Sequence, residues 1–233
     1  MTTFDATFNQ SSPRLGAVRR SQPAPAGQAD RHLKRGLDLV LVLLSAVVLL
    51  PIVGLAALAI QLVDRGPVFY AQERRGLGGR RIRVWKLRTM YGDAAARLER
   101  HLAENPAARQ EWSRFFKLRD DPRVLPWIGA LLRRSSIDEL PQLWNLLLGD
   151  MTLVGPRPLP DYHLAAFDGA FRHQRQTVIP GLTGLWQVAA RSDGDVAVMR
   201  RLDGFYIANR SIGLDLQILL RTVAVVLAGH GAR

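Results

Sequence analysis

Cysteine is absent from all 233 residues of the sequence. Its absence excludes disulfide bonds, thiolate zinc sites and a cysteine nucleophile, and it indicates a chain that does not depend on an oxidising compartment. The five histidines show no metal-ligand spacing, so a histidine zinc centre is not expected. Acidic side chains are scarce, because 20 Asp and Glu stand against 32 Lys and Arg, for a formal charge of +12. This surplus favours phosphates, anionic lipid or nucleic acid as partners.

Apolar residues make up 48% of the chain, which is enough for a folded core and excludes a wholly disordered protein. The first thirty residues are the exception, because they are rich in Ser, Pro, Ala, Gln and Gly without periodicity. We therefore expect three parts: a disordered tail at 1–30, a membrane segment at 31–64 and a folded domain at 65–233.

The membrane segment is indicated by residues 37–63, whose only charge is Asp38 and whose other polar side chains are Ser45 and Gln61. About 20 apolar residues cover a hydrocarbon core of about 30 Å, and no polar face of the kind a soluble helix needs is visible. A secretory signal fits poorly, because a long polar stretch precedes the segment and no small-residue cleavage site follows it.

Pro51 lies in the middle of this segment, where it removes a backbone hydrogen bond and must kink or break the helix. Both flanks are basic: residues 1–36 carry six Arg and Lys with two Asp, and residues 64–91 carry eight with two acids. Positive flanks are retained on the cytoplasmic side of a membrane. A kinked spanning helix and a re-entrant helix that returns to the same side therefore remain equal alternatives on these grounds.

The folded domain reads as α+β and mostly helical. Residues 67–76 and 81–90 are β-rich and joined by a glycine-rich turn at 76–79, which predicts a hairpin. Residues 93–104 and 107–118 look helical, with a stop at Asn105-Pro106 between them, and a final apolar helix is expected at 214–228.

Two short apolar segments are candidates for helices at the membrane surface. Residues 124–134 contain Trp127 and end in two arginines, which suits either the core or a membrane interface. The second segment has apolar residues at helical spacing on one face, ended by Gly149. That face consists of Leu140, Leu143, Trp144, Leu147 and Leu148.

Asp138 and Glu139 stand just before this second helix, and Pro141 marks its first turn. The simplest interpretation is structural: Asp138 caps the helix and Glu139 favours its dipole. The alternative is chemical, because a helix N-terminus attracts anions and Arg133 and Arg157 are near in sequence. Among such positive charges a carboxylate stays ionised and can act as a nucleophile.

Three further arginine and lysine assignments stay open on the sequence alone. Arg157 either serves a phosphate or pairs with Asp150. Lys86 and Arg88 either bind phosphate or belong to a basic strand that faces lipid headgroups.

The sequence blocks as a set resemble the bacterial sugar transferases, the monotopic polyprenyl-phosphate hexose-1-phosphate transferases of exopolysaccharide and capsule synthesis. The resemblance runs from Lys34 to the C-terminus. It rests on the basic pair and Asp38 before a proline-broken apolar segment, and on the blocks GPVFYAQERRG, VWKLRTM, SSIDELPQLWNLLLGDMTLVGPRP and PGLTGLWQV.

This resemblance implies a re-entrant membrane helix, a cytoplasmic, membrane-associated catalytic domain and a location at the bacterial inner membrane. It implies transfer of a hexose-1-phosphate from a UDP-sugar to undecaprenyl phosphate with release of UMP. Asp138 and Glu139 match the family's catalytic pair, and Arg133 and Arg157 match its phosphate-binding arginines. Mg²⁺ is the implied cofactor, with Asp138 and Glu139 as its ligands, and a homo-oligomer is among the expected partners.

The residues allow a two-step reaction in which Asp138 attacks the sugar-bearing phosphorus and the lipid phosphate then displaces it. A phosphate monoester is already largely dianionic at pH 7, so Glu139 is expected to bind metal or orient the acceptor rather than act as a base. The C-terminal block at 202–222 resembles that of hexose enzymes and predicts galactose or glucose.

Two departures from the family pattern are Leu50, where Ser often precedes the helix-breaking proline, and Arg210, where Trp is usual. Longer members carry additional domains upstream, so this chain is expected to be a catalytic unit alone. The alternatives from other classes are a membrane-anchored scaffold without activity and a basic nucleic-acid-binding protein. No nucleic-acid motif is readable, and nucleic acid is not expected as a partner.

Overall fold

A computed structural model describes residues 28–115, 118–190 and 196–227. Most of the predicted N-terminal tail lies outside these ranges. The described chain is mostly helical with two small sheets, as expected for its class. Its principal elements are α1 Gln28–Val63, β1 Phe69–Arg75, η2 Leu77–Gly79, β2 Arg81–Leu87, α2 Ala94–Glu104, α3 Pro106–Phe115, α4 Ile128–Ser135, η3 Ile137–Glu139, α5 Gln142–Leu148, β3 Thr152–Val154, α6 Asp161–Leu164, α7 Gly169–Gln176, β4 Gly181–Thr183, α8 Leu185–Ala189, α9 Val196–Asn209 and α10 Ile212–Leu227.

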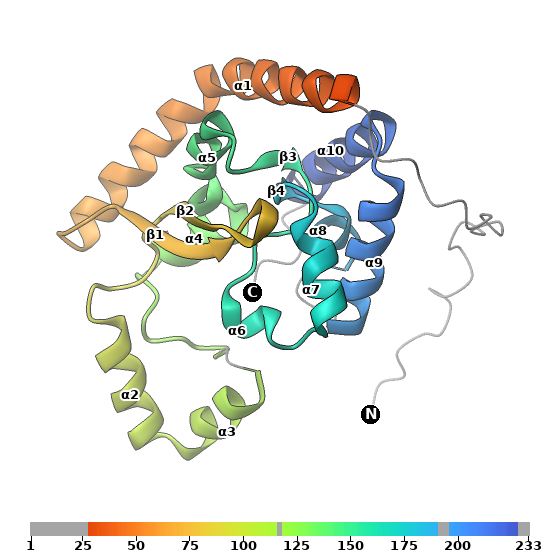
Figure 1. Cartoon of the computed structure of the whole chain (residues 1–233). Coiled ribbons are helices and arrows are strands. Elements are labelled where there is room, and N and C mark those ends of the chain that lie inside the picture. Colours follow the sequence, from red (N-terminus) through yellow and green to blue (C-terminus); the bar gives the residue numbers. More distant parts are fainter. Residues whose placement is uncertain (1–27, 116–117, 191–195, 228–233) are drawn as a thin grey trace, which may run out of the picture.

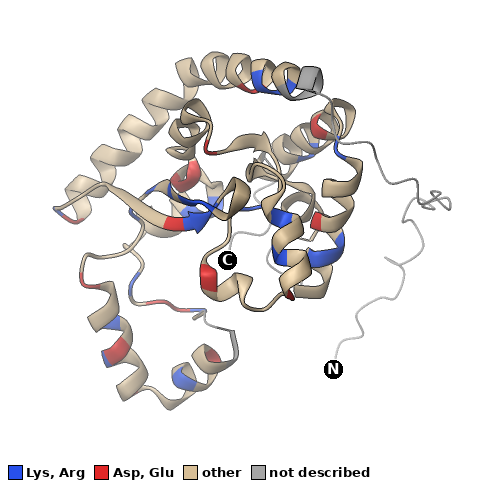
Figure 2. Ribbon diagram, viewed as in Figure 1, with Lys and Arg blue, Asp and Glu red and all other residues tan. Residues whose placement is uncertain are grey.

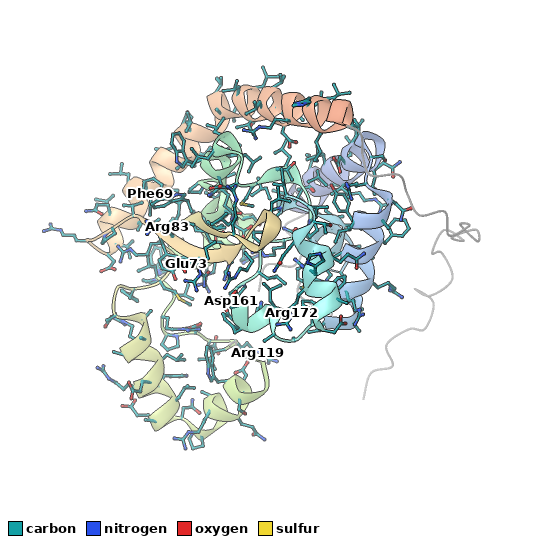
Figure 3. All side chains as sticks on the ribbon, viewed as in Figure 1. Phe69, Glu73, Arg83, Arg119, Asp161 and Arg172 are labelled. Atoms are coloured by element: carbon teal, nitrogen blue, oxygen red, sulfur yellow. The ribbon has the colours of Figure 1, made fainter. Side chains whose placement is uncertain are left out.

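Helix α1 contains Pro51 and runs along the outer edge of the molecule as two arms with a bend between them (Figure 1). Its stretch His32–Val63 is long and apolar enough to cross a membrane. Figure 2 shows this helix without charged residues over most of its length and with charges near its two ends. In Figure 3 many of its side chains project outward from the body. The predicted kinked apolar helix is therefore present.

Both arms of α1 pack against the folded domain. Val42 in the first arm is buried in a core cluster with Val84 and Leu146. Ile60 in the second arm is fully buried in another cluster, with Leu125. Beyond Ile60, Asp64 forms an ion pair with Arg88 just after β2. The two ends of the helix are thus attached to one body.

A group of polar side chains lies under the first arm of α1, and we call it the N-terminal clamp. It consists of Lys34, Asp38, Thr152, Tyr206 and Asp215. Lys34 Nζ donates to Asp215 Oδ2 at 2.5 Å, and the hydroxyl of Thr152 donates to Asp38. The hydroxyl oxygen of Tyr206 lies 2.8 Å from Asp215 Oδ1. The clamp ties α1 to β3 and α10.

The predicted hairpin is confirmed as the antiparallel pair β1 and β2. Alternate residues of a strand point to opposite faces. Ile82 and Val84 are buried in the core, so Lys86, two residues further along β2, lies on the inner face of the hairpin. Tyr70 pairs with Lys86 in the register and Arg74 pairs with Ile82.

A second sheet, which the sequence interpretation did not include, pairs β3 with β4 in parallel. Glycines permit the close approach of its chains. A Cβ on Gly181 would lie 2.0 Å from the Gly155 nitrogen, and one on Gly184 would lie 2.3 Å from the Gly155 carbonyl oxygen. The glycines of PGLTG are therefore packing residues. They hold the turn that follows Gly155.

An amphipathic helix is expected to bury its apolar face, but α5 exposes most of its own. Its apolar face is largely exposed at Trp144, Leu147 and Leu148, whereas Gln142 and Asn145 are buried. The buried amide of Asn145 is satisfied by β2, because its oxygen accepts from the Trp85 amide and its nitrogen donates to the Arg83 carbonyl. Trp144, Leu147 and Leu148 thus point away from the core, whereas Leu146 is buried in it and Leu143 packs partly buried against it.

Helix α4 combines the two interpretations of residues 124–134. Leu125 and Leu132 are buried in the core, while Trp127 is 90% exposed and Leu131 is also exposed. The final helix α10 is similarly two-sided, with Ile218 buried and further apolar side chains outside. The exposed residues of α10 are Leu216, Leu220, Val223 and Val226.

Helices α2 and α3 confirm the predicted stop and restart at Asn105-Pro106. The Asn105 side chain accepts a hydrogen bond from the Ala108 amide at 3.1 Å, which caps the second helix. The two helices extend from the rest of the body as a separate lobe (Figure 1). Residues 116–117 within the predicted second helix lie outside the described ranges.

Candidate functional site

Asp138 and Glu139 lie in the short η3 turn between α4 and α5. Ser136 adopts the left-handed conformation, with φ of 58°, and reverses the chain at the end of α4. Pro141 precedes α5, in agreement with the expected start of that helix. Ser136 and Pro141 occupy the N-cap positions of η3 and α5, and neither makes a side-chain cap hydrogen bond. Asp138 therefore does not hold the capping position that the simplest interpretation gave it.

Glu139 is held by two cations from different parts of the chain. Lys86 Nζ on β2 donates to its Oε1 at 2.7 Å. Arg157 donates to the same oxygen at 2.5 Å and to Oε2 at 3.3 Å. The alternative pairing of Arg157 with Asp150 is wrong, because Asp150 binds Arg80 at 2.7 Å instead. The structure thus unites three of the predicted site residues.

These contacts decide the charge of Glu139. Burial by itself would raise the pKa of this carboxyl, but the positive charges of Arg157 and Lys86 and their hydrogen bonds outweigh burial and hold the pKa well below its usual range. Glu139 in turn raises the pKa of Arg157. Glu139 and Arg157 are therefore both charged at neutral pH, and Glu139 is unsuited to accept a proton.

Asp138 has a different environment. Within the described part of the chain, no group donates a hydrogen bond to its carboxylate. Burial and the neighbouring charge of Glu139 raise its pKa to about 6, although Lys86, Arg133 and Arg157 oppose this shift. At pH 7 about nine in ten Asp138 carboxylates are therefore ionised. An ionised oxygen without a donor is available to react or to bind.

Arg133, on the last turn of α4, lies close to Asp138 and contributes to the electrostatic balance of that carboxylate. Its Nε donates to the Thr89 hydroxyl at 2.9 Å, which orients the guanidinium. Burial lowers the pKa of Arg133, against the opposing charges of Asp121 and Asp138. The predicted position of this arginine beside the acidic pair is consistent with the structure. We call Lys86, Arg133, Asp138, Glu139 and Arg157 the central cluster.

Arg157 is positioned by a second buried ion pair that sequence reasoning missed. Arg175 on α7 forms an ion pair with Asp203 on α9, and its Nη2 donates to the Arg157 carbonyl at 2.5 Å. The β3–β4 sheet supports the same turn, since the Gly181 amide donates to the Pro156 carbonyl at 3.0 Å. No local signal marks Arg175 and Asp203, because they lie 28 positions apart.

Arg88, also predicted to bind phosphate, is placed elsewhere. β2 ends at Leu87, and the guanidinium of the next residue turns to the end of α1. There it binds the side chain of Asp64 and, at 2.6 Å, its backbone carbonyl. Its contacts are therefore with the end of α1 rather than with the acidic pair.

The predicted magnesium ligands differ in their fitness for a metal. Both oxygens of Glu139 already accept from cations, whereas Asp138 is free. Across the described ranges, no three or more His, Asp or Glu side chains gather as a metal centre. Magnesium is commonly bound by one or two carboxylates together with substrate phosphates. Asp138 with substrate oxygens fits that pattern better than the pair does.

Figure 2 shows Lys and Arg residues gathered along the hairpin and toward α7, around the interior of the molecule. An ionised carboxylate among fixed cations, next to a helix long and apolar enough to cross a membrane, is typical of one class of protein: those that bind phosphate groups at a membrane.

Comparisons with known proteins agree with this class. The bacterial sugar transferase family model matches residues 29–229, and the chain belongs to that family. It is 40% identical over 89% of its length to the UDP-galactose-lipid carrier transferase of Erwinia amylovora, of which it spans 43%. It is 37% identical over 85% of its length to the exopolysaccharide production protein ExoY of Sinorhizobium fredii, covering 87% of that protein.

A third relative is the UDP-glucose:undecaprenyl-phosphate glucose-1-phosphate transferase of Caulobacter vibrioides. The identity is 40% over 95% of this chain and 79% of the relative. The chain thus spans less than half of the Erwinia protein but most of the other two.

Proposed function

We propose that the protein transfers a hexose-1-phosphate from a UDP-hexose to undecaprenyl phosphate, releases UMP and starts the synthesis of an exopolysaccharide or capsule repeat unit. The observation that carries this proposal is the different environment of two adjacent carboxylates. Glu139 is neutralised by Lys86 and Arg157, while Asp138 stays ionised and free beside them. The names of the relatives, which include galactose and glucose transferases to lipid carriers, supply the substrates.

In the first step, an Asp138 oxygen attacks the sugar-bearing phosphorus of the UDP-hexose. A bond forms from the carboxylate to phosphorus, the bond to the bridging oxygen breaks, and UMP leaves with that oxygen. Phosphoryl transfer of this kind depends mainly on positioning and on neutralising the phosphate oxygens. Arg133 beside Asp138 is placed for neutralisation, and Arg157 is oriented by Arg175.

In the second step, an oxygen of the lipid phosphate attacks the same phosphorus and Asp138 leaves as a carboxylate. The products are a polyprenyl-diphosphate-hexose and the regenerated site. No general base is required, because the acceptor phosphate is largely dianionic at pH 7. Glu139 holds Lys86 and Arg157 at their places rather than taking a proton.

Magnesium remains part of the proposal, with Asp138 and the substrate phosphates as its ligands. When bound, the ion neutralises charge on the transferring phosphoryl group. Glu139 is a weaker candidate ligand, because a metal on its oxygens would stand beside two cations already paired with them.

The membrane helix supports a re-entrant topology. About 27 residues of α helix measure about 40 Å, so a straight spanning helix would place its two ends on opposite sides of the bilayer. In the structure both arms contact the same folded body, through Lys34 to Asp215 and through Asp64 to Arg88. One body cannot lie on both sides of a membrane. We therefore place both ends of α1 and the domain on the cytoplasmic face of the inner membrane.

The exposed apolar side chains of α4 and α5 support docking of the domain on the same membrane. Trp127, Trp144 and Leu148 are all exposed and lie on short helices with buried inner faces. Such two-sided helices suit the boundary between headgroups and acyl chains. This position would bring Asp138, in the turn between α4 and α5, close to the headgroup region where a lipid phosphate resides.

The transferred sugar is proposed to be galactose or glucose. The relatives' names include both. Arg210, the departure from the family's hexose block, donates its Nη1 to the Ile207 carbonyl at 2.9 Å and so caps its own helix. That contact gives the substitution a local structural role and removes it as an argument against a hexose.

The function is tested by incubating the membrane-embedded protein with undecaprenyl phosphate and a panel of UDP-sugars. UMP release and lipid-linked product are then measured. UDP-galactose or UDP-glucose should be consumed fastest, and UMP and lipid product should form in equal amounts. Faster turnover of an N-acetylated or diamino sugar would contradict the hexose assignment. No turnover of any UDP-sugar would contradict the function itself.

A further inference from the structure

One buried cation of the hairpin has an unpartnered nitrogen. Arg74 on β1 donates its Nη2 to the side-chain oxygen of Gln72. Its Nη1 is buried and has no hydrogen-bond partner among the described residues. Buried polar atoms in native proteins almost always have partners, and an unpaired guanidinium nitrogen is costly. The structure therefore keeps an unused donor at this position.

The neighbourhood of Arg74 belongs to the central cluster. By the strand alternation, Arg74 lies on the same hairpin face as Lys86. Its charge interacts with Arg157 and with Glu139. Burial lowers the pKa of Arg74, with Arg157 acting in the same direction. The guanidinium is thus a further cation close to Arg157 and Glu139 of the central cluster.

The acids near Arg74 are already committed to other partners, and the free carboxylate of Asp138 is not among the charges that act most strongly on Arg74. Glu139 is bound by Lys86 and Arg157. Asp161 pairs with the adjacent Arg75 at 2.6 Å, and its position beside the hairpin is visible in Figure 3. Glu73, on the opposite face of β1, pairs with Arg81 at 3.3 Å. The described chain therefore provides no anion as a partner for Arg74 Nη1.

We propose that Arg74 is a phosphate-binding residue of the site and that its free Nη1 binds a phosphate oxygen of a substrate. This inference rests on the proposed function and adds a residue to it. Phosphate suits the position, because its oxygens accept charge-assisted hydrogen bonds from guanidinium groups. The ligand is either the diphosphate of the sugar nucleotide or the phosphate of the lipid acceptor, which share this chemistry.

The experiment compares Arg74→Gln and Arg74→Lys with a matched control, Arg81→Gln. Arg81 lies on the same hairpin, carries the same charge and is exposed. Arg74→Gln should lower kcat/KM by about 100-fold and Arg74→Lys by about tenfold, since lysine keeps the charge but loses the fork. Arg81→Gln should stay within about twofold of wild type.

Two kinetic arms identify the phosphate. A loss in kcat/KM for the UDP-sugar, at saturating lipid, assigns Arg74 to the donor. A loss confined to kcat/KM for undecaprenyl phosphate, at saturating donor, assigns it to the acceptor. Unchanged values in both arms would overturn the proposal while leaving the proposed function intact. An inactive wild type would instead contradict the function.

Thermal unfolding separates binding from a structural role. Arg74→Gln removes an unpaired buried charge, so its melting temperature should equal or exceed that of wild type. Addition of the phosphate ligand identified by the kinetics should raise the melting temperature of wild type more than that of Arg74→Gln. A lowered melting temperature together with an equal ligand-induced shift would show that Arg74 supports the fold and would overturn the proposal.

Discussion

Two clusters of buried charged groups lie in the same small domain and are organised differently. In the N-terminal clamp, Lys34 binds Asp215, Asp38 accepts from Thr152, and the Tyr206 hydroxyl contacts Asp215. Each member has a partner within the chain. In the central cluster, Glu139 is fully engaged but the adjacent Asp138 accepts no hydrogen bond within the described ranges. We call the N-terminal clamp closed, because every member has a partner in the chain, and the central cluster open, because Asp138 accepts no hydrogen bond within the described ranges.

The difference separates a structural role from a chemical one. A closed network of buried ions holds elements together and gains little from a ligand. An open one keeps a charged oxygen and spare cations at a cost in stability, which is the pattern of sites that bind or react. The clamp ties α1 to the folded body, and the central cluster has the pattern of charges that suits phosphate groups.

Replacing Asp138 with Asn should give the largest effect on activity. A neutral amide is a poor nucleophile toward phosphorus, so UMP release should fall by at least about 1,000-fold. The fold should not suffer, because Asp138 caps no helix and its charged form is disfavoured by burial. UMP release and thermal unfolding at pH 7.5 measure the two properties. Substantial remaining activity, or a strongly lowered melting temperature, would make Asp138 a structural residue.

Glu139→Gln, unlike Asp138→Asn, should lower the stability of the fold. It leaves Lys86 and Arg157 without their anion in a partly buried place, which should cost about 3 kcal/mol of unfolding free energy. Activity should fall as well, because both cations lose their fixed positions. Denaturant unfolding of Asp138→Asn and Glu139→Gln side by side is the measurement. Equal stability of the two variants would contradict the distinction between the free and the engaged carboxylate.

Asp215→Asn tests the closed cluster. It leaves Lys34 without its anion and should lower stability by about 1–3 kcal/mol, less than Glu139→Gln because Asp215 holds one cation and Glu139 holds two. Amide hydrogen exchange should increase in the first arm of α1 and in β3, with less change around η3. If exchange increases only around Asp138, the N-terminal clamp does not stabilise the first arm of α1. Arg81→Gln on the hairpin serves as the exposed-pair control.

Acid pH should affect the open cluster first. With the pKa of Asp138 at about 6, kcat/KM should fall by about half between pH 7.5 and 6, about fivefold more by pH 5, and about tenfold per unit below that. Stability should change in the opposite direction. Because the folded-state pKa of Asp138 is raised, its charge destabilises the fold above pH 6, and this cost disappears as pH falls toward 4. The pH profiles of activity and melting temperature for wild type and Asp138→Asn measure both effects. An unchanged wild-type rate from pH 7.5 to 5 would contradict a reaction that requires an Asp138 carboxylate with a pKa of about 6.

The sequence was a good guide where local patterns decide structure. The glycine turn at 76–79 predicted the hairpin, and Pro51 predicted the kink of the apolar helix. The proximity of Arg133 to Asp138 followed from their short separation in the chain. Lys86 remained ambiguous, and only the alternation of β2, with Ile82 and Val84 buried, places it toward Glu139.

Long-range packing could not be read in the same way. Helix α5 exposes its apolar face because the amide of Asn145 satisfies the backbone of β2, a contact across 60 positions. The Arg175–Asp203 pair and the β3–β4 sheet likewise join distant segments. The position of Arg74 could have been predicted from the sequence. It lies four residues after Tyr70 on the same strand, so both side chains are on the hairpin face that carries Lys86. Its binding role was suggested only by the unpartnered Nη1 atom, which the three-dimensional structure shows and the sequence does not.

The most direct test of Asp138 as the nucleophile uses UDP-hexose without lipid acceptor. We expect wild type to release UMP in a burst of about one per active molecule and to gain the mass of one phosphohexose on the peptide that contains Asp138. Asp138→Asn should show neither the burst nor the adduct. If UMP appears only when lipid phosphate is present, and no adduct forms on wild type, transfer is direct and Asp138 is not the nucleophile.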